Sequence, residues 1–244
     1  MTKQRSILIT GASGGIGAGV VSYLRSLGYD KIACQYLTTE TALRRIFDGD
    51  EFERCCFQAD LTDEKQVATL HDRVSASIGP IQGLINLAGA STGAMSWKMS
   101  TEEFTKIVNA NLLTTFLTCR EFIPEMRRQA SGRIINTSSV VAFAGTVGAS
   151  HYCAAKAGIV GFTKALSLEL APFGITANAL ALGYFDCGLI NHLTPGMQDD
   201  VKLKTPLRRF GKVEEVGGLV NYLLSDSGGF TTGQVHHTNG GFYL

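Results

Sequence analysis

Short apolar runs alternate along the chain with longer segments of helical length. The runs are rich in residues that favour β-strands: SILIT (6–10), KIACQY (31–36), CCFQAD (55–60), GLINLAG (83–89), GRIINTSS (132–139), ITANALAL (175–182) and QVHHT (234–238). Apolar strands separated by helices are typical of a parallel sheet buried between two helical layers. The pattern predicts an α/β protein with a doubly wound parallel sheet of about seven strands.

Three helices stand out between these runs. We expect them over roughly 101–129, where Pro124 is a candidate kink, over 151–171, and over 213–225. The segment 184–212 shows no regular pattern, and an irregular insert of that length usually acts as a lid. A chain of 244 residues with this alternation is expected to form one domain, 1–244, with 184–212 as its substrate lid.

Charge and length narrow the class of partner. The 22 basic and 21 acidic residues leave a net charge of +1, without a run of like charge. We therefore expect a small-molecule partner, and neither nucleic acid nor a membrane. The chain enters its first strand after a few polar residues and has no apolar span of membrane-crossing length, so a cytoplasmic location is expected.

The cysteines and histidines are not spaced like metal ligands. The six cysteines have no CxxC spacing, and the histidines at 71, 151, 192, 236 and 237 have no partner four residues away. We expect reduced thiols and no metal site.

A glycine-rich turn follows the first predicted strand. ILITGASGGIG places Gly11, Gly15 and Gly17 between that strand and the next helix. Glycine lets the backbone approach a pyrophosphate closely, and the helix amino terminus adds unpaired N–H groups. The spacing is not the common G-x-G-x-x-G, but its place in the first β–α unit favours a dinucleotide site.

Tyr152 and Lys156 stand four residues apart in HYCAAKAG (151–158). On a helix they share one face, so the ammonium favours ionisation of a phenol that otherwise titrates near pH ~10. Taken alone, such a pair is more often a solvated helix face. As chemistry, it predicts a proton donor.

Further motifs stand in order along the chain: TGASGGIG (10–17), DLT (60–62), NLAG (86–89), NANL (109–112), NTSSVV (136–141) and the Tyr-x-x-x-Lys pair. With them the chain resembles the short-chain dehydrogenase/reductase family from about residue 6 to the C-terminus, and this implies a single-domain Rossmann-type fold. Within the family, GRIINTSSVVAFAG (132–145) and TGQVHHTNGGFYL (232–244) are most similar to the 3-oxoacyl-[acyl-carrier-protein] reductases.

The resemblance implies a role for each catalytic residue. Tyr152 would protonate a carbonyl oxygen as hydride arrives, and Lys156 would lower the pKa of Tyr152 and hold the nicotinamide ribose. Ser139 would orient the same oxygen, with Ser138 as the alternative. Asn111 would bind a water that relays protons to Lys156, and Asn109 competes for that role.

A cofactor-binding set follows from the same motifs. Asp60 would meet the adenine amino group, although it is also a candidate cap for the helix that begins near Asp63. Asn86 is expected to brace the strands and the cofactor edge rather than to do chemistry. The full set is Gly11, Ser13, Gly15, Ile16, Gly17, Thr38, Asp60, Leu61, Asn86, Ala88, Gly89, Tyr152, Lys156, Gly183 and Phe185.

The end of the second predicted strand, CQYLTTE (34–40), bears on the choice of cofactor. It lacks the carboxylate that takes the ribose hydroxyls of NAD and repels a 2′-phosphate, because Glu40 suits the first turn of the next helix. Hydroxyls at Ser13, Thr38 and Thr39, with Arg44 or Arg45 beyond them, are suited to hold a phosphate. We expect NADPH, with NADH possible.

Three positions depart from the family pattern. Leu182 and Gly183 replace its Pro-Gly, and Cys187 replaces a threonine that contacts the cofactor. Phe173 stands where carrier-protein reductases have a basic residue that meets the acidic carrier. The basic side chains at 127, 128 and 133 are candidates to replace it.

The function expected is NADPH-dependent reduction of a 3-oxoacyl thioester in fatty-acid or polyketide-type biosynthesis. The substrate would be a small molecule or a carrier-bound acyl group, with an acidic acyl carrier protein as a possible partner. The alternatives are reduction of another ketone and cofactor binding without turnover. The resemblance also implies a homotetramer built on the helices near 101–129 and 151–171.

Overall fold

Seven strands form one sheet in the computed structural model, which describes residues 5–188, 190 and 193–244. They are β1 (Ile7–Thr10), β2 (Ile32–Tyr36), β3 (Cys56–Gln58), β4 (Gly83–Asn86), β5 (Gly132–Ser139), β6 (Ile175–Leu182) and β7 (Val235–Thr238). Every neighbouring pair is parallel, in the order β3-β2-β1-β4-β5-β6-β7. The predicted doubly wound, Rossmann-type sheet is confirmed.

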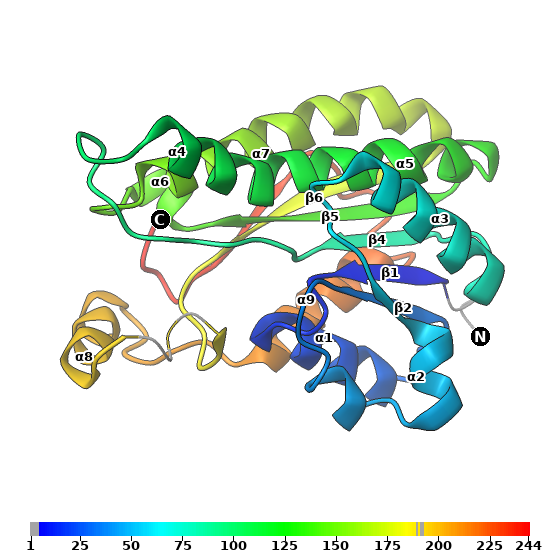
Figure 1. Cartoon of the computed structure of the whole chain (residues 1–244), viewed down its shortest axis with the longest axis horizontal. Helices are drawn as coiled ribbons and strands as arrows, with labels where there is room; N and C mark the ends of the chain where they lie inside the picture. Colours follow the sequence, from blue (N-terminus) through cyan, green and yellow to red (C-terminus); the bar gives the residue numbers. More distant parts are fainter. Residues whose placement is uncertain (1–4, 189, 191–192) are drawn as a thin grey trace.

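Two helical layers cover the sheet (Figure 1). One holds α1 (Gly15–Ser26), α2 (Gly49–Cys55) and α9 (Val213–Leu224), whose apolar residues join one core cluster. The other holds α3 (Glu64–Ile78), α5 (Thr114–Arg128) and α7 (Ser150–Leu170), which build a second cluster on the opposite face. Because both faces are covered, nearly all residues of β1 to β6 are buried, including polar ones such as Asn86 and Asn136.

The predicted helix over 101–129 is present but is interrupted. It consists of α4 (Thr101–Val108), a π-helical turn (Asn109–Leu113) and α5. A capping box between Ser100 and Glu103 fixes its start, and Pro124 lies inside α5. The interruption thus falls at the π-helical turn, and such turns are frequent at functional sites. The helices expected over 151–171 and 213–225 are α7 and α9, each within one residue.

The segment 184–212 is more regular than its sequence predicted. Its middle is α8 (Pro195–Lys204), with Pro195 at the first helical position and the Thr194 side chain accepting from the Met197 amide. Figure 1 shows α8 standing apart from both helical layers. Positions 189 and 191–192 lie outside the described residues, and the role of the segment as a lid stays a prediction.

Four short elements complete the chain as described: the 3₁₀ turns Leu43–Arg45 and Ala171–Phe173, the helix α6 (Val141–Ala144), and an isolated bridge between Phe185 and Gly211. Among the described helices, none is both long enough and apolar enough to cross a membrane.

Candidate active site

Two adjoining cavities lie at the carboxyl end of the sheet, where strand order reverses between β1 and β4. One has a volume of about 460 Å³ and the other about 510 Å³. Both are lined by the glycine turn at Gly11 and Gly14 and by the loop that follows β4 at Leu87, Gly89 and Ala90. Such a crevice is where doubly wound proteins bind ligands.

All but two of the predicted site residues line these cavities. The first holds Gly11, Gly15, Ile16, Gly17, Gly89, Ser139, Tyr152, Lys156, Gly183 and Phe185, and the second holds Gly11, Ser13, Thr38, Asp60, Leu61, Ala88 and Gly89. Asn86 and Asn111 lie behind the lining, buried among other polar groups.

The glycine turn leaves no room for side chains. Gly11 has φ +62°, and a Cβ there would lie 2.7 Å from the backbone nitrogen of Ala88. A Cβ on Gly17 would lie 2.3 Å from the carbonyl oxygen of Gly11. The first turn of α1 is thereby pressed against the β1 turn, so its free N–H groups face the cavity.

Gly17→Ala is therefore expected to lower the free energy of unfolding by about 1–3 kcal/mol. Its Cβ would meet the Gly11 carbonyl oxygen at 2.3 Å and the Ala12 Cα at 2.8 Å, and these backbone atoms can shift only with the rest of the turn. Gly14→Ala is the matched control, since its Cβ would lie 3.4 Å from the nearest atom, the Gly11 oxygen. Its expected cost is below about 1 kcal/mol, the size of an N-cap change. Urea unfolding measures both, and equal costs would contradict the close packing at Gly17.

The α7 helix brings Tyr152 and Lys156 together at the cavity wall. Lys156 is buried, its Nζ donates to the carbonyl oxygen of Thr137 at 2.8 Å, and the same Nζ lies 5.6 Å from the ring centre of Tyr152. The pair is therefore not a solvated helix face. Instead it joins α7 to the end of β5.

The pKa of the Tyr152 phenol is raised rather than lowered as expected. Burial raises the pKa of Tyr152 to about 12, and only the hydrogen bond with the Ser139 hydroxyl lowers it. Burial also lowers the pKa of Lys156 to about 8. Lys156 is not among the groups that lower the phenol pKa, because its ammonium donates to the Thr137 carbonyl and desolvation dominates both pKa values.

The two serines at the end of β5 have different surroundings. Ser138 is fully buried, and its Oγ donates to the carbonyl oxygen of Lys156 at 2.8 Å. Ser139 has only long contacts besides Tyr152: its Oγ lies 3.5 Å from the Leu182 oxygen and 3.4 Å from the Val141 nitrogen. The geometry favours Ser139 as the hydroxyl available to a substrate.

Asn111 lies in the π-helical turn and has one unused acceptor. Its Nδ2 donates to the carbonyl oxygens of Ala90 (2.7 Å) and Ile107 (2.8 Å), while its Oδ1 is buried without a partner. A Cβ on Gly89 would lie 2.5 Å from that Oδ1 and 3.4 Å from the Lys156 Nζ. An unpaired acceptor and an ammonium thus border one small space, which suits a water or a sugar hydroxyl.

Asn86 is the centre of a buried polar network. Its Nδ2 donates to the Asn136 Oδ1 at 2.9 Å, and its Oδ1 accepts from the Thr118 hydroxyl at 2.9 Å. Asn136 continues the network to Thr163 on α7. Because these hydrogen bonds fix β4 to β5 and to both flanking helices, the structure favours the expected bracing role.

The second cavity is lined by small polar side chains. Asp60 accepts from the Thr62 amide (2.8 Å) and hydroxyl (2.7 Å), whereas Asp63 caps α3 by accepting from the amides of Lys65 and Gln66. The alternative role of Asp60 as the helix cap is therefore wrong, and its carboxylate lines the cavity.

The turn after β6 survives the loss of its proline. The Gly183 amide donates to the Thr238 carbonyl at 2.9 Å, and a Cβ on Gly183 would lie 2.6 Å from the Asn239 Cα. Burial raises the pKa of Cys187 to about 11, so this thiol stays protonated at neutral pH. Tyr184 also lines the cavity, and sequence reasoning missed it although it lies only two residues after the end of β6.

The described residues include no group of three or more histidine, cysteine, aspartate or glutamate side chains placed to hold a metal. His192, considered with the other histidines, lies outside the described residues. The six cysteines are free thiols.

The glycine cradle, the buried ammonium and the unpaired Asn111 oxygen fit a nicotinamide dinucleotide. The phosphates would lie at the α1 amino terminus, and the nicotinamide ribose would lie near Lys156. When bound, this cofactor supplies or accepts a hydride.

Comparison with known proteins agrees with this geometry. A family model described as short chain dehydrogenase matches residues 5–198. The chain is 33% identical over 247 residues to "3-oxoacyl-[acyl-carrier-protein] reductase FabG" of Staphylococcus aureus, with all of both chains covered. It is 34% identical over 248 residues to "Acetoacetyl-CoA reductase" of an Acinetobacter strain, again over both whole chains. It is also 32% identical over 241 residues to "Nodulation protein G" of Azospirillum brasilense, covering 98% of each.

Proposed function

Because the chain belongs to the short-chain dehydrogenase family and is an NAD(P)-dependent oxidoreductase that acts on keto or CH–OH groups, we propose that it reduces 3-oxoacyl thioesters with NADPH. The observation that carries the proposal is the meeting of Ser139, Tyr152 and the buried Lys156 in one cavity beside the glycine turn. The printed names of two relatives, a 3-oxoacyl carrier-protein reductase and an acetoacetyl-CoA reductase, support the substrate class.

The proposed roles follow from the position of each group. The Tyr152 hydroxyl donates its proton to the carbonyl oxygen as hydride adds to the carbonyl carbon, so a ketone becomes a secondary alcohol. Ser139 donates a second hydrogen bond to that oxygen and stabilises its developing charge. Lys156 holds the ribose hydroxyls, and a water on the Asn111 Oδ1 returns a proton toward Tyr152.

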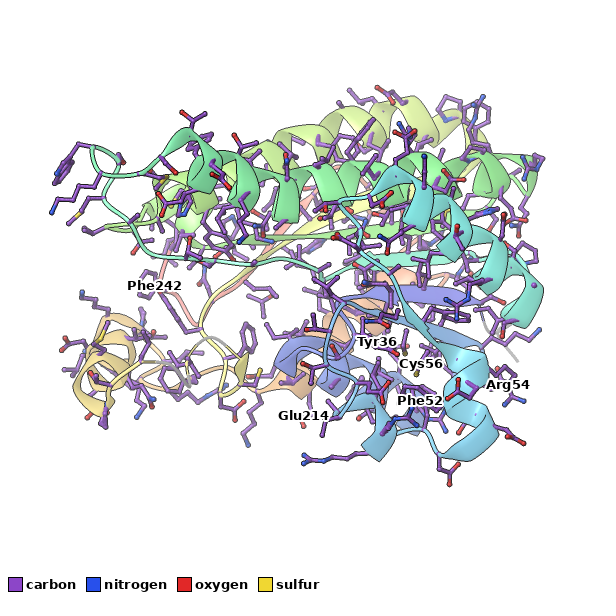
Figure 2. All side chains as sticks on the ribbon, viewed as in Figure 1. Tyr36, Phe52, Arg54, Cys56, Glu214 and Phe242 are labelled. Carbon is purple, nitrogen blue, oxygen red and sulfur yellow. The ribbon has the colours of Figure 1, made fainter. Side chains whose placement is uncertain are left out.

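Reduction of a different ketone is the second candidate, and the aromatic residues near the cavity favour it. Tyr184 packs against Phe242 with ring centres 5.4 Å apart, and Phe143 against Tyr243 at 5.4 Å. Figure 2 shows Phe242 beyond the carboxyl end of the sheet, on the side of α8. Of these four rings, that of Tyr184 lines the cavity, and a flat ring there suits a cyclic substrate. The third candidate is cofactor binding without turnover. It does not explain why Ser139, Tyr152 and Lys156 lie together in one cavity.

A turnover panel with NADPH separates the three candidates. The substrates are acetoacetyl groups on acyl carrier protein and on coenzyme A, and a cyclic ketone such as cyclohexanone. We expect kcat/KM to be highest for the carrier-bound thioester and lowest for the cyclic ketone. The reverse order would favour the second candidate, and binding of NADPH without turnover of any substrate would favour the third.

Two of the three arginines proposed to meet a carrier are available. Arg127 lies over the ring of Phe173, with its guanidinium carbon 4.2 Å from the ring centre, and Arg128 is exposed. The expectation for Arg133 is wrong, because that side chain is 8% exposed and donates to the Gly132 carbonyl oxygen. Arg127 therefore places a positive charge next to Phe173, where the carrier-protein reductases have a basic residue and this chain does not.

We expect the ratio of carrier-bound to coenzyme A turnover to fall as salt rises from about 50 to about 500 mM, because exposed charges are screened. Arg127→Ala should lower the ratio at low salt and flatten its salt dependence. Arg73→Ala is the matched control, since Arg73 also covers a phenylalanine ring, that of Phe57, but on α3. If the turnover ratio changed neither with salt nor in Arg127→Ala, docking of the carrier at Arg127 would be ruled out.

We also propose a homotetramer and a cytoplasmic location. Phe116 and Phe162 form an edge-to-face pair on α5 and α7, with ring centres 6.1 Å apart, and Leu168 on α7 is 78% exposed. Apolar groups of this kind favour contact between copies of the chain. The six free thiols suit a reducing compartment. Sedimentation velocity tests the assembly, for which four copies are expected.

A further inference from the structure

Of the two arginines expected to hold a cofactor phosphate, Arg45 is exposed, whereas Arg44 is held by acidic neighbours. The Nε of Arg44 donates to the Glu40 Oε1 at 2.5 Å, and its guanidinium lies 3.7 Å from a carboxylate oxygen of Glu53. The guanidinium carbon also lies 3.9 Å above the ring centre of Phe52. The guanidinium of Arg44 is therefore already bound by three side chains of the protein itself, those of Glu40, Glu53 and Phe52.

Glu40 is itself fixed from the other side. Its Oε2 accepts the hydroxyl of Tyr36, the last residue of β2, at 3.0 Å. The ring centres of Tyr36 and of Phe52, a residue of α2, lie 6.2 Å apart, and Figure 2 shows the two residues near each other. The hydrogen bonds from Arg44 and Tyr36 lower the pKa of the Glu40 carboxyl, which therefore stays ionised.

The adjoining cavity, in contrast, has no cation in its wall among the described residues. Its lining includes Ser13, Thr38 and Thr39, which carry hydroxyls, the apolar Leu37, and Asp60. The carboxyl end of β2 is where a doubly wound fold meets the adenosine ribose. A 2′-phosphate there would find neutral donors, while Arg44 stands a few residues further along the chain.

We propose that Glu40 sets the cofactor preference by withholding Arg44 from the 2′-phosphate of NADP. The inference rests on the proposed function only in that a nicotinamide dinucleotide occupies the groove. A guanidinium prefers a phosphate or a carboxylate in a two-point arrangement, so the phosphate and Glu40 compete for it. Because exposed ion pairs break at little cost, Glu40 weakens the preference for NADP without removing it.

The test is direct binding of NADP⁺ and NAD⁺, measured by titration calorimetry on the full chain. Glu40→Gln keeps the shape of the side chain and removes its charge. We expect it to tighten NADP⁺ binding by about fivefold, the equivalent of about 1 kcal/mol for an exposed ion pair, and to leave NAD⁺ binding within about 1.5-fold. In the double variant Glu40→Gln with Arg44→Ala, the gain should disappear. Glu40→Ala serves as a second variant, and thermal unfolding checks that each protein is folded.

Glu51→Gln is the matched control. Glu51 lies on α2 and forms an ion pair with Arg25 at 2.8 Å. Glu51→Gln therefore changes the net charge by the same amount as Glu40→Gln, and Glu51 is not part of the cavity lining. An equal gain in Glu51→Gln would overturn the proposal in favour of net charge alone. Unchanged NADP⁺ binding in Glu40→Gln, or weaker NAD⁺ binding as its main effect, would also overturn it, the latter by showing that Glu40 holds the ribose. If the unmutated chain bound neither cofactor, the proposed function itself would fail.

Discussion

Tyr152→Phe is expected to lower kcat at least about 100-fold, because it removes the only proton that the proposed mechanism transfers directly to the carbonyl oxygen. Cofactor affinity should stay nearly unchanged, since the ring and its packing remain. The pKa of about 12 does not oppose the role, because at neutral pH the phenol carries the proton that a reduction consumes. Steady-state kinetics and cofactor titration measure the two effects separately.

Tyr184→Phe is the matched control for this substitution. Tyr184 lines the same cavity and burial also raises the pKa of its hydroxyl, but no hydrogen bond with Ser139 contributes to that pKa, in contrast to Tyr152. Its loss should reduce kcat by less than about 10-fold, the range of one neutral hydrogen bond. Equal losses in the two variants would refute the assignment of Tyr152 as the acid.

Lys156→Ala is expected to reduce both turnover and cofactor affinity, by at least about 10-fold each, because one ammonium serves the ribose and the proton path. Lys164→Ala, on the exposed side of the same helix, is the control and should change neither. Unchanged cofactor affinity in Lys156→Ala would show that the ammonium does not contact the ribose.

The pH dependence gives this variant a second measurement. The pKa of Lys156 is about 8, so the side chain is charged below that pH and neutral above it. The cofactor affinity of the unmutated chain should therefore fall as pH rises through about 8, and Lys156→Ala should lack that fall. A fall of the same size in the variant would assign the titration to another group.

The sheet could be predicted because burial of both faces makes most of its strands predominantly apolar runs. The glycine turn could be predicted for a similar reason, since Gly11 and Gly17 have backbone where a Cβ would be. The π-helical turn could not, because residues 109–113 carry no pattern that separates it from an α-helix. Its position becomes meaningful only with the unpaired Asn111 oxygen in view.

The incorrect predictions share one physical origin. The spacing of residues in the sequence does not show which side chains are buried, nor which neighbours compete for the same charged group. Tyr152 and Lys156 are four residues apart as expected, yet desolvation determines the pKa of both. Arg133 is expected at the surface because arginine is charged, but it is the second residue of β5 and is buried. Arg44 is near the expected phosphate site in sequence, but Glu40 and Phe52 compete for it.

Hydride transfer to a 3-oxoacyl thioester is the central claim, and an isotope measurement tests it most directly. The unmutated protein is incubated with acetoacetyl-acyl carrier protein and NADPH that carries deuterium at both positions of nicotinamide C4, and the acyl product is analysed by mass spectrometry. We expect 3-hydroxybutyryl thioester with one deuterium, bound to C3. Absence of this product, or a product without deuterium, would contradict the account.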